Sequence, residues 1–331
     1  MFLNPMKKLL YILLVAALCT ACNRDKKKEE PTGPFIFFET LVGETGTLPQ
    51  QEGEAFGVFG YRHTEESLNN VFTDYDDKIA QVSWDAEDGV FAYSRLAKWS
   101  EGTYSFYAYY PYGYRNSERL TVIDNARYKT LQFVQPCELD DMVDLMTASA
   151  ESVVKTPDPV RLQFKSRLFG VDVVIVNNDN PNSGAKSVTV LGAQIDFSGV
   201  PQSLEFDIDG TGYNVSSETV TINADLYSAS QALELEAGNE YSFTKELGNS
   251  FYFIPAEGIK YSFAVEYVNE DGEADIYTYP ENGDWATFGK VVEAGAKYAI
   301  VIDSSNGTPY PFTASLVADW EEKVDIDNDF N

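Results

Sequence analysis

The sequence has few of the residues that catalytic and metal sites use. Histidine occurs once, at position 63, and cysteine only three times in 331 residues. A single histidine excludes zinc sites built from several imidazoles. A Ser-His-Asp triad would need His63, which lies beside the charged segment Thr64–Glu66, and no nucleophile-elbow or glycine-rich phosphate motif is present. A lone thiol such as Cys137 can act as a nucleophile, but a buried, inert thiol is the simpler interpretation. We therefore expect no enzyme, no metal site and no cofactor.

Positive charge is also scarce. The chain carries 24 Lys and Arg against 52 Asp and Glu, which gives a formal net charge of −28. A chain this acidic does not neutralise phosphates, so nucleic acid is excluded as a partner. Asp325, Asp327 and Asp329 resemble the start of a calcium loop, but the glycine at its sixth position is missing and the chain ends before its twelfth. Among the 52 acids, no pair of carboxylates stands out for glycosidase chemistry.

Beyond the N-terminus, no segment sustains the 3.6-residue apolar period of a helix. Instead, short alternations of apolar and polar residues recur, separated by turn sequences such as Asp88-Gly89 and Asp271-Gly272. The aromatic stretch Thr103–Tyr112 suits a half-buried strand, and we expect it to be central in a β-sandwich with one face buried. Glycines in the strand predicted at Ala55–Tyr61 are expected to mark bulges. These patterns predict an all-β fold.

The first 21 residues have the pattern of a secretory signal. Lys7 and Lys8 precede the apolar run Leu9–Leu18, which is too short to cross the roughly 30 Å of bilayer hydrocarbon as a helix. The small residue before Cys22 makes the segment resemble a bacterial lipoprotein signal, and this implies a lipidated Cys22 that anchors the protein to the outer membrane. The alternative is ordinary secretion with a free thiol. Once Cys22 is acylated, Cys137 is the remaining thiol, so no intrachain disulfide is expected.

The predicted mature chain consists of a tether and two domains. Residues 22–33 are charged, then rich in Pro and Gly, and contain no further apolar residue, which indicates a flexible tether. The polar segment 149–159 carries two prolines and indicates a boundary. We therefore expect one domain over 34–157 and a second over 158–331, each large enough to bury its own core. Removing the signal takes away two lysines and no acid, so the net charge falls from −28 to −30.

The two ends of the folded part have distinctive strands. The first predicted strand, 34–42, opens with a nearly continuous apolar run, as in a strand buried on both faces: Phe35, Ile36, Phe37 and Phe38. The C-terminal tail alternates apolar and polar residues almost to its end, and its apolar positions include Trp320, Val324, Ile326 and Phe330. Such a tail can pair with a sheet edge, either in its own domain or in another molecule.

Several segments occur in an order that matches a known family. They are Glu54–Phe59, Trp99–Gly102, Tyr107–Tyr112, Asp144–Met146, Val160–Phe164 and Trp320. This order resembles the fimbrillin-like family, the type V pilin subunits and relatives of Gram-negative anaerobes. The resemblance spans most of the chain and implies two transthyretin-like β-sandwich domains in tandem. It also implies a lipoprotein of the cell surface whose partners are other fimbrial subunits and a receptor on a host or bacterial surface.

The resemblance further implies assembly by strand exchange. In the family, a protease removes the first strand, and the C-terminal strand of another subunit fills the groove, which is a form of β-augmentation. On this chain the removable strand would contain Phe35–Phe38, and the donor would lie within Phe312–Phe330. Family stalk subunits can be cut by an arginine-specific protease after the first strand, but no Lys or Arg lies between Lys28 and Arg62. Either another protease acts or the strand stays, as in an anchor or a non-polymerising subunit.

A surface glycan-binding lipoprotein of a polysaccharide uptake system is the alternative function. Such proteins are also lipidated β-sandwiches with exposed aromatic residues. Trp84, Trp99 and Trp285 lie at predicted turns, where their rings could stack on sugars. Aromatic side chains aligned on one exposed face would favour this alternative, and a C-terminal strand swapped between subunits would favour the fimbria.

Overall fold

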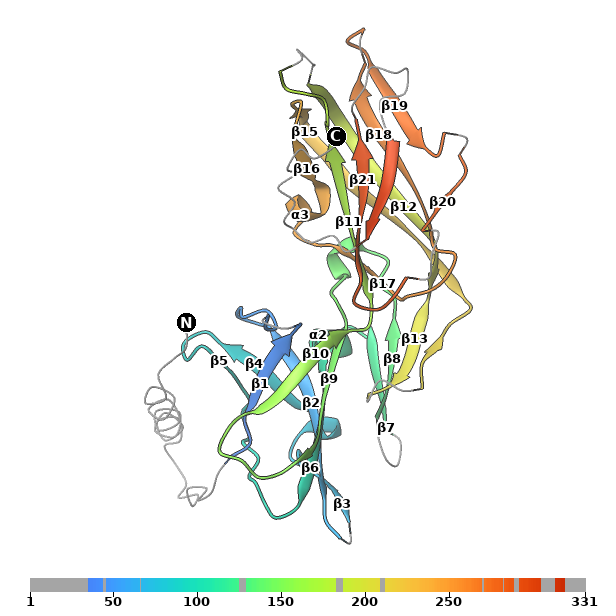
Figure 1. Cartoon of the computed structure of the whole chain (residues 1–331). Helices are drawn as coiled ribbons and strands as arrows, with labels where there is room; N and C mark the ends of the chain where they lie inside the picture. Colours follow the sequence, from blue (N-terminus) through green and yellow to red (C-terminus); the bar gives the residue numbers. More distant parts are fainter. Residues whose placement is uncertain are drawn as a thin grey trace. The chain divides into compact units, whose positions relative to one another are not determined.

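Strands dominate the computed structural model, and the few helices are short (Figure 1). Within the described residues, the helical segments are η1 (Asp76–Lys78), α2 (Gly113–Asn116), η2 (Leu139–Asp141) and α3 (Phe243–Leu247). The all-β prediction is confirmed. The structure describes residues 35–43, 46–65, 67–124, 129–182, 187–208, 212–269, 271–281, 283–288, 292–304 and 313–318.

An eight-stranded sheet contains most of the N-terminal strands. Its order is β1 (Phe38–Val42), β10 (Val160–Ser166), β9 (Met146–Val153), β6 (Thr103–Tyr110), β2 (Ala55–His63), β4 (Ala80–Asp85) and β5 (Val90–Ala92), with β3 (Leu68–Asn70) paired to β2. The aromatic strand β6 lies between β2 and β9, in the middle of the sheet as its sequence predicts. All neighbours run antiparallel except β1 and β10, which are parallel.

Strand β6 is buried on both faces over much of its length. Tyr104 and Phe106 belong to one hydrophobic cluster, whereas Tyr109 packs into another with Phe59. The sequence predicted one buried face, so this expectation was wrong for β6. The second face is covered because strands from later in the chain bring their own apolar residues, such as Leu204, against it.

Three further sheets complete the described fold. The four-stranded sheet has the order β14 (Asn214–Val215), β13 (Ser203–Asp207), β8 (Lys129–Val134) and β7 (Leu120–Asp124). One five-stranded sheet has the order β16 (Glu240–Ser242), β11 (Phe169–Val176), β21 (Lys297–Asp303) and β22 (Thr313–Ala318), with β17 (Phe251–Phe253) paired to β11. The other five-stranded sheet has the order β15 (Thr219–Leu235), β12 (Val188–Pro201), β18 (Lys260–Val268) and β19 (Ala274–Tyr279), with β20 (Ala286–Thr287) paired to β18.

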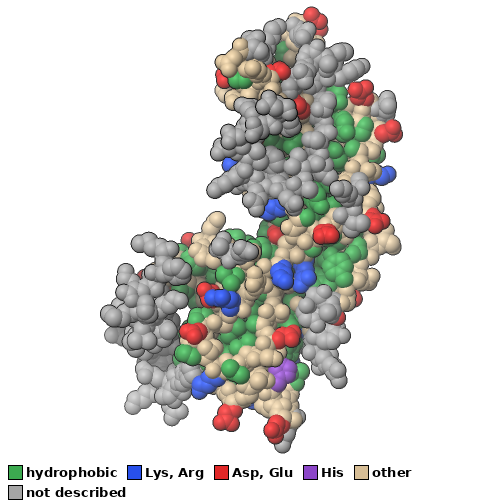
Figure 2. Space-filling model, in the orientation of Figure 1, with side chains coloured by type: hydrophobic (Ala, Val, Ile, Leu, Met, Phe, Trp, Pro, Cys, Tyr) green, Lys and Arg blue, Asp and Glu red, His purple; other side chains and the backbone are tan. Residues whose placement is uncertain are grey.

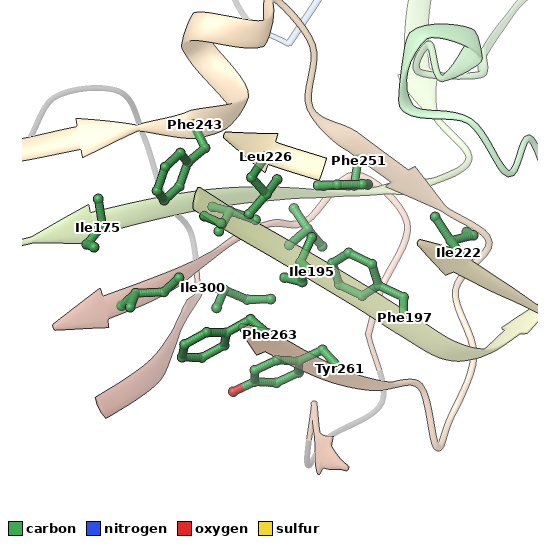
Figure 3. Close-up of a cluster of buried hydrophobic side chains, with 14 of the residues drawn as sticks. Ile175, Ile195, Phe197, Ile222, Leu226, Phe243, Phe251, Tyr261, Phe263 and Ile300 are labelled. Carbon is green, nitrogen blue, oxygen red and sulfur yellow. The ribbon is translucent and has the colours of Figure 1, made fainter. Parts of the chain in front are cut away.

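The largest core lies between the two five-stranded sheets (Figure 3). Ile175 and Ile300 come from one sheet, and Ile195, Phe197 and Phe263 come from the other. All five are at most 3% exposed. Burying one such side chain fully contributes about 1.5–3 kcal/mol, so this paired arrangement supplies a major part of the stability of a β-sandwich.

The predicted boundary near residue 157 does not separate the sheets cleanly. Strand β10 follows this point but pairs with β9 and β1, which precede it. Strand β13 likewise follows it and pairs with β8, which precedes it. The division into domains 34–157 and 158–331 therefore stays a prediction.

Candidate functional site

Strand β1 lies at one edge of the eight-stranded sheet. It pairs with β10 alone in the sheet order, in parallel register from Phe38 beside Val160 to Val42 beside Phe164 (Figure 1). Ahead of the strand, the backbone N–H of Ile36 donates to the carbonyl of Ala97 at 2.9 Å. Because β1 has one strand neighbour, it can be lost without breaking any ladder except its own with β10.

The side chains of β1 alternate between the core and the surface. Ile36, Phe38 and Thr40 are at most 6% exposed, whereas Glu39 is exposed and Phe37 is half-buried. The expectation that both faces are buried was therefore wrong. The physical reason is that only one face of this edge packs on a core, which produces an alternating pattern of burial.

Phe38 anchors β1 in an aromatic cluster. Its ring packs edge-on against Phe106 of β6 at a centroid distance of 5.4 Å, and it lies 6.0 Å from Tyr93 and 6.3 Å from Phe72. The hydroxyl of Tyr93 in turn donates to the carbonyl of Ile36 at 2.6 Å. Without β1, this aromatic cluster and the outer edge of β10 would both face solvent.

The described part of the C-terminal tail forms β22. It pairs antiparallel with β21 and ends the sheet order, so within the described residues its other edge has no strand neighbour. The predicted donor residues Trp320, Val324, Ile326 and Phe330 lie outside the described residues, as does the predicted lipidation site Cys22.

The Asp144–Met146 motif belongs to a segment that ties several strands together. Asn249 donates to the carbonyls of Leu139 and Met142 at 2.7 and 2.6 Å. The carboxyl of Asp144 forms a hydrogen bond with the hydroxyl of Ser166, and burial raises the pKa of Asp144 to about 7. These contacts give the motif a structural role.

Gln135, which the sequence analysis did not single out, connects the four-stranded sheet to β17. Its amide nitrogen donates to the carbonyl of Tyr252 at 2.9 Å, and its amide oxygen accepts from the N–H of Ile254 at 3.1 Å. The side chain is only 2% exposed. A single polar residue at the end of a strand carries no sequence signal for such a contact, because its partners lie more than a hundred residues away.

The tryptophans of the glycan-binding alternative do not form one platform. Trp99 is 6% exposed and packs edge-on against Tyr104 at 4.7 Å, so its predicted sugar-stacking role was wrong. Its ring fills the core instead. Trp285 is 37% exposed, and Trp84 is half-buried beside an open groove at β4 and β5.

The groups considered for chemistry are apart from one another. His63 lies on the surface, where histidine is purple in Figure 2, and its Nε2 is 3.0 Å from the hydroxyl of Ser105 on the neighbouring strand. Cys137 is a half-buried free thiol beside the C-terminal core. In the described part of the chain, no cluster of three or more His, Cys, Asp or Glu is arranged to hold a metal ion. No described helix is both long and apolar enough to cross a membrane.

One comparison with known proteins identifies a family, and solved structures share the fold. A family profile described as "Fimbrillin-like" matches residues 44–320. A crystal structure of a fimbrial protein from Bacteroides vulgatus superposes with a TM-score of 0.59 at 15% identity, covering 85% of this chain and 98% of that one. No curated protein sequence matches the chain.

Two further solved structures share the fold. Both are described as a "putative cell adhesion protein". The one from Bacteroides uniformis has a TM-score of 0.52 at 17% identity and covers 87% of this chain and 99% of its own. The one from Bacteroides ovatus has a TM-score of 0.52 at 14% identity and covers 89% of this chain and 100% of its own.

Proposed function

The chain belongs to the fimbrillin-like family, and from this premise we propose that it is a structural or adhesive subunit of surface fimbriae. The family is structural and adhesive, so the chain is not an enzyme. In the proposal the protein is exported, lipidated at Cys22 and held at the outer membrane. It joins other fimbrial subunits and presents a surface to a receptor on a host or another bacterium.

The observation that carries this proposal is the placement of β1. Among the described strands of its sheet, β1 and β10 form the one parallel pair, and β1 lies at the edge. Phe38 of β1 and Ile36 just before it pack in an aromatic core. Loss of β1 would expose apolar side chains and the free edge of β10 together. A strand from another subunit that covers these side chains and pairs with this edge would be bound by backbone hydrogen bonds and by apolar burial.

The parallel direction of β1 would favour its replacement by a donor strand. Parallel pairing is slightly less stable per residue than antiparallel pairing. A donor that enters antiparallel to β10 would therefore replace β1 with better hydrogen-bond geometry. In this proposal the donor is the C-terminal tail of a neighbour, with Trp320, Val324, Ile326 and Phe330 supplying alternate apolar side chains as Ile36 and Phe38 do now.

Cleavage would have to occur between β1 and β2. Residues 49–53 form the longest run of exposed residues described there, whereas Leu48 is 1% exposed and packs in the core. Arg62, the first basic residue after Lys28, lies within β2, where its backbone is paired with Tyr104. A protease that removes β1 would therefore act within 49–53, at neutral or acidic residues, and an arginine-specific enzyme would not.

The N-terminus of the protein purified from cells tests this proposal. A start within 49–53, together with heat-labile multimers on gels, is the expected result for a polymerising subunit. A start at Cys22 in assembled fimbriae would overturn strand removal and leave an anchor or accessory role. Absence of the protein from purified fimbriae, in cells that make it, would overturn the fimbrial role itself.

A further inference from the structure

An open groove of about 900 Å³ lies beside β4 and β5. Gln81 and Ser83 alternate with the buried Ala80 and Val82 along β4, so they point away from the core and into the groove. The loops around η1 and after β5 form its sides, with Tyr75 among the lining residues. The groove is therefore built on a strand inside the sheet and is separate from the ladder between β1 and β10.

Four aromatic residues line the groove; Tyr93 is buried, and the other three are partly exposed, each held by its neighbours. The hydroxyl of Tyr75 accepts from the N–H of Arg95 at 2.7 Å and donates to the carbonyl of the same residue at 3.3 Å. Trp84 packs edge-on against Phe91 with a centroid distance of 5.2 Å. Tyr112 stacks on the fully buried Tyr109 at 6.2 Å. Rings fixed in this way lose little freedom when a ligand binds.

Polar side chains in the same groove are available to a ligand. Those of Glu52, Asp76, Gln81 and Ser83 form no hydrogen bond with any other residue in the described ranges. They offer carboxylate acceptors next to an amide and a hydroxyl that both donate and accept. A binding groove with a few convergent polar groups beside aromatic rings suits a ligand that has both apolar faces and many hydroxyls.

The charges in the groove restrict the ligand further. Five carboxylates line it, from Glu52, Asp74, Asp76, Asp85 and Glu87, against a single cation, Arg95. The guanidinium of Arg95 already donates to the carbonyl of Asp74 and lies over the ring of Tyr75 at 5.7 Å. The negative field disfavours phosphate, sulfate and uronic acid groups. A cationic ligand would find ion-pair partners in these carboxylates, so an oligolysine peptide is the competing ligand in the test below.

We propose that this groove is a binding site for a neutral saccharide. The rings of Trp84, Tyr75 and Tyr112 would pack on the C–H faces of the sugar, and its hydroxyls would donate to the carboxylates and exchange hydrogen bonds with Gln81 and Ser83. The site uses no residue of β1 or β22, so it goes beyond the proposed assembly role and does not depend on strand exchange.

The test uses the full chain and immobilised oligosaccharides of three kinds: neutral, amino-bearing and anionic. The tightest neutral oligosaccharide is then titrated by calorimetry into the wild type and three variants. Ser83→Arg places a bulky cation on the groove floor from an outward-facing position, and Trp84→Ala removes one ring. Trp285→Ala is the matched control, because Trp285 is exposed and does not line the groove. The expected result is a dissociation constant raised at least tenfold by Ser83→Arg and Trp84→Ala, and changed less than twofold by Trp285→Ala.

Three results would overturn the proposal: no neutral oligosaccharide binds, binding survives Ser83→Arg, or only Trp285→Ala removes it. An oligolysine peptide is titrated in parallel. If this peptide binds the wild type but not Ser83→Arg, and no saccharide binds, then the groove is a site for cations and the proposal is wrong. Circular dichroism and melting curves check each variant, and Ser83→Arg keeps the test decisive if Trp84→Ala fails to fold. Fimbrial multimers should form normally in Ser83→Arg, so failure here is distinguishable from failure of the assembly role.

Discussion

The carboxyl of Asp144 and the hydroxyl of Ser166 share a partly buried hydrogen bond where β9 begins and β10 ends. Ser166 has one hydroxyl hydrogen, and its oxygen also lies 2.8 Å from the carbonyl of Leu168. A protonated Asp144 can donate to Ser166, which leaves the serine hydrogen for Leu168. This geometry agrees with the direction of the pKa, which burial raises to about 7 although Ser166 and Lys297 lower it.

The raised pKa predicts a specific dependence of stability on pH. An unfolded aspartate titrates near 3.9, so between about pH 4 and 7 the folded chain holds a proton that the unfolded chain releases. The stabilisation from Asp144 is therefore complete below about pH 4 and is lost as pH rises through 7. Asp144→Asn should match the wild type near pH 4 and be more stable by about 2–4 kcal/mol at pH 8.

Urea unfolding across this pH range, with the variant subtracted from the wild type, isolates the contribution of Asp144. The exposed Asp140→Asn is the matched control and should change the free energy of unfolding by less than about 0.5 kcal/mol at each pH. A difference between wild type and Asp144→Asn that stays constant from pH 4 to 8 would contradict the raised pKa.

A second prediction concerns Gly57 in β2, where a neighbouring strand leaves no room for a side chain. A Cβ added there would lie 2.5 Å from Cζ of the fully buried Tyr109 ring. Gly57→Ala should therefore lower the free energy of unfolding by about 1–3 kcal/mol, the usual effect of overpacking. At Gly113 in α2 an added Cβ meets nothing within 4 Å, so Gly113→Ala should be neutral or stabilise by about 0.4–1 kcal/mol. Thermal melting of both variants checks the prediction. Equal losses of stability in the two variants would contradict it.

Gly57 also illustrates a feature of this fold that the sequence could not predict. Alternation and turn residues located most strands, since both signals are local. Glycines in β2 were expected to mark bulges, yet the ladders of β2 with β6 and β4 run without a register shift. Position 57 leaves no room for a side chain because the ring of Tyr109 from β6 lies over it, and that contact depends on which strands become neighbours.

The parallel pairing of β1 was unpredictable for the same reason. Its partner β10 lies more than a hundred residues away, and the apolar run at Phe35–Phe38 indicates burial without indicating direction. The candidate groove was only partly visible in the sequence. Trp84 was identified at a turn, but its separation from Trp99 and its closeness to Tyr75 and Tyr112 arise from the packing of loops against the sheet.

A third prediction concerns Gln135, whose side chain contacts two backbone groups in and just after β17, a strand of a different sheet. Gln135→Ala would leave the carbonyl of Tyr252 and the N–H of Ile254 without this partner in a buried site. Each unsatisfied buried group costs about 1–3 kcal/mol, so the loss in the free energy of unfolding should fall at or above that range. Gln132→Ala, at an exposed position of β8, should cost less than about 0.5 kcal/mol. Urea denaturation distinguishes the two, and equal effects would contradict a bridging role.

The last prediction tests whether β1 is held mainly by one side chain. Phe38→Ala removes a buried ring that packs on Phe106, Phe72 and Tyr93, and should lower the free energy of unfolding by about 3–5 kcal/mol. Glu39→Ala, one residue along the same strand but exposed, should cost under about 0.5 kcal/mol. If β1 opens as a unit, Phe38→Ala should also speed cleavage within residues 49–53 by a glutamate-specific protease, since Glu52 lies there. Urea denaturation and timed proteolysis measure the two effects. A loss of stability without faster cleavage would mean that β1 opens only when the whole sheet unfolds, which would count against its removal from the folded subunit.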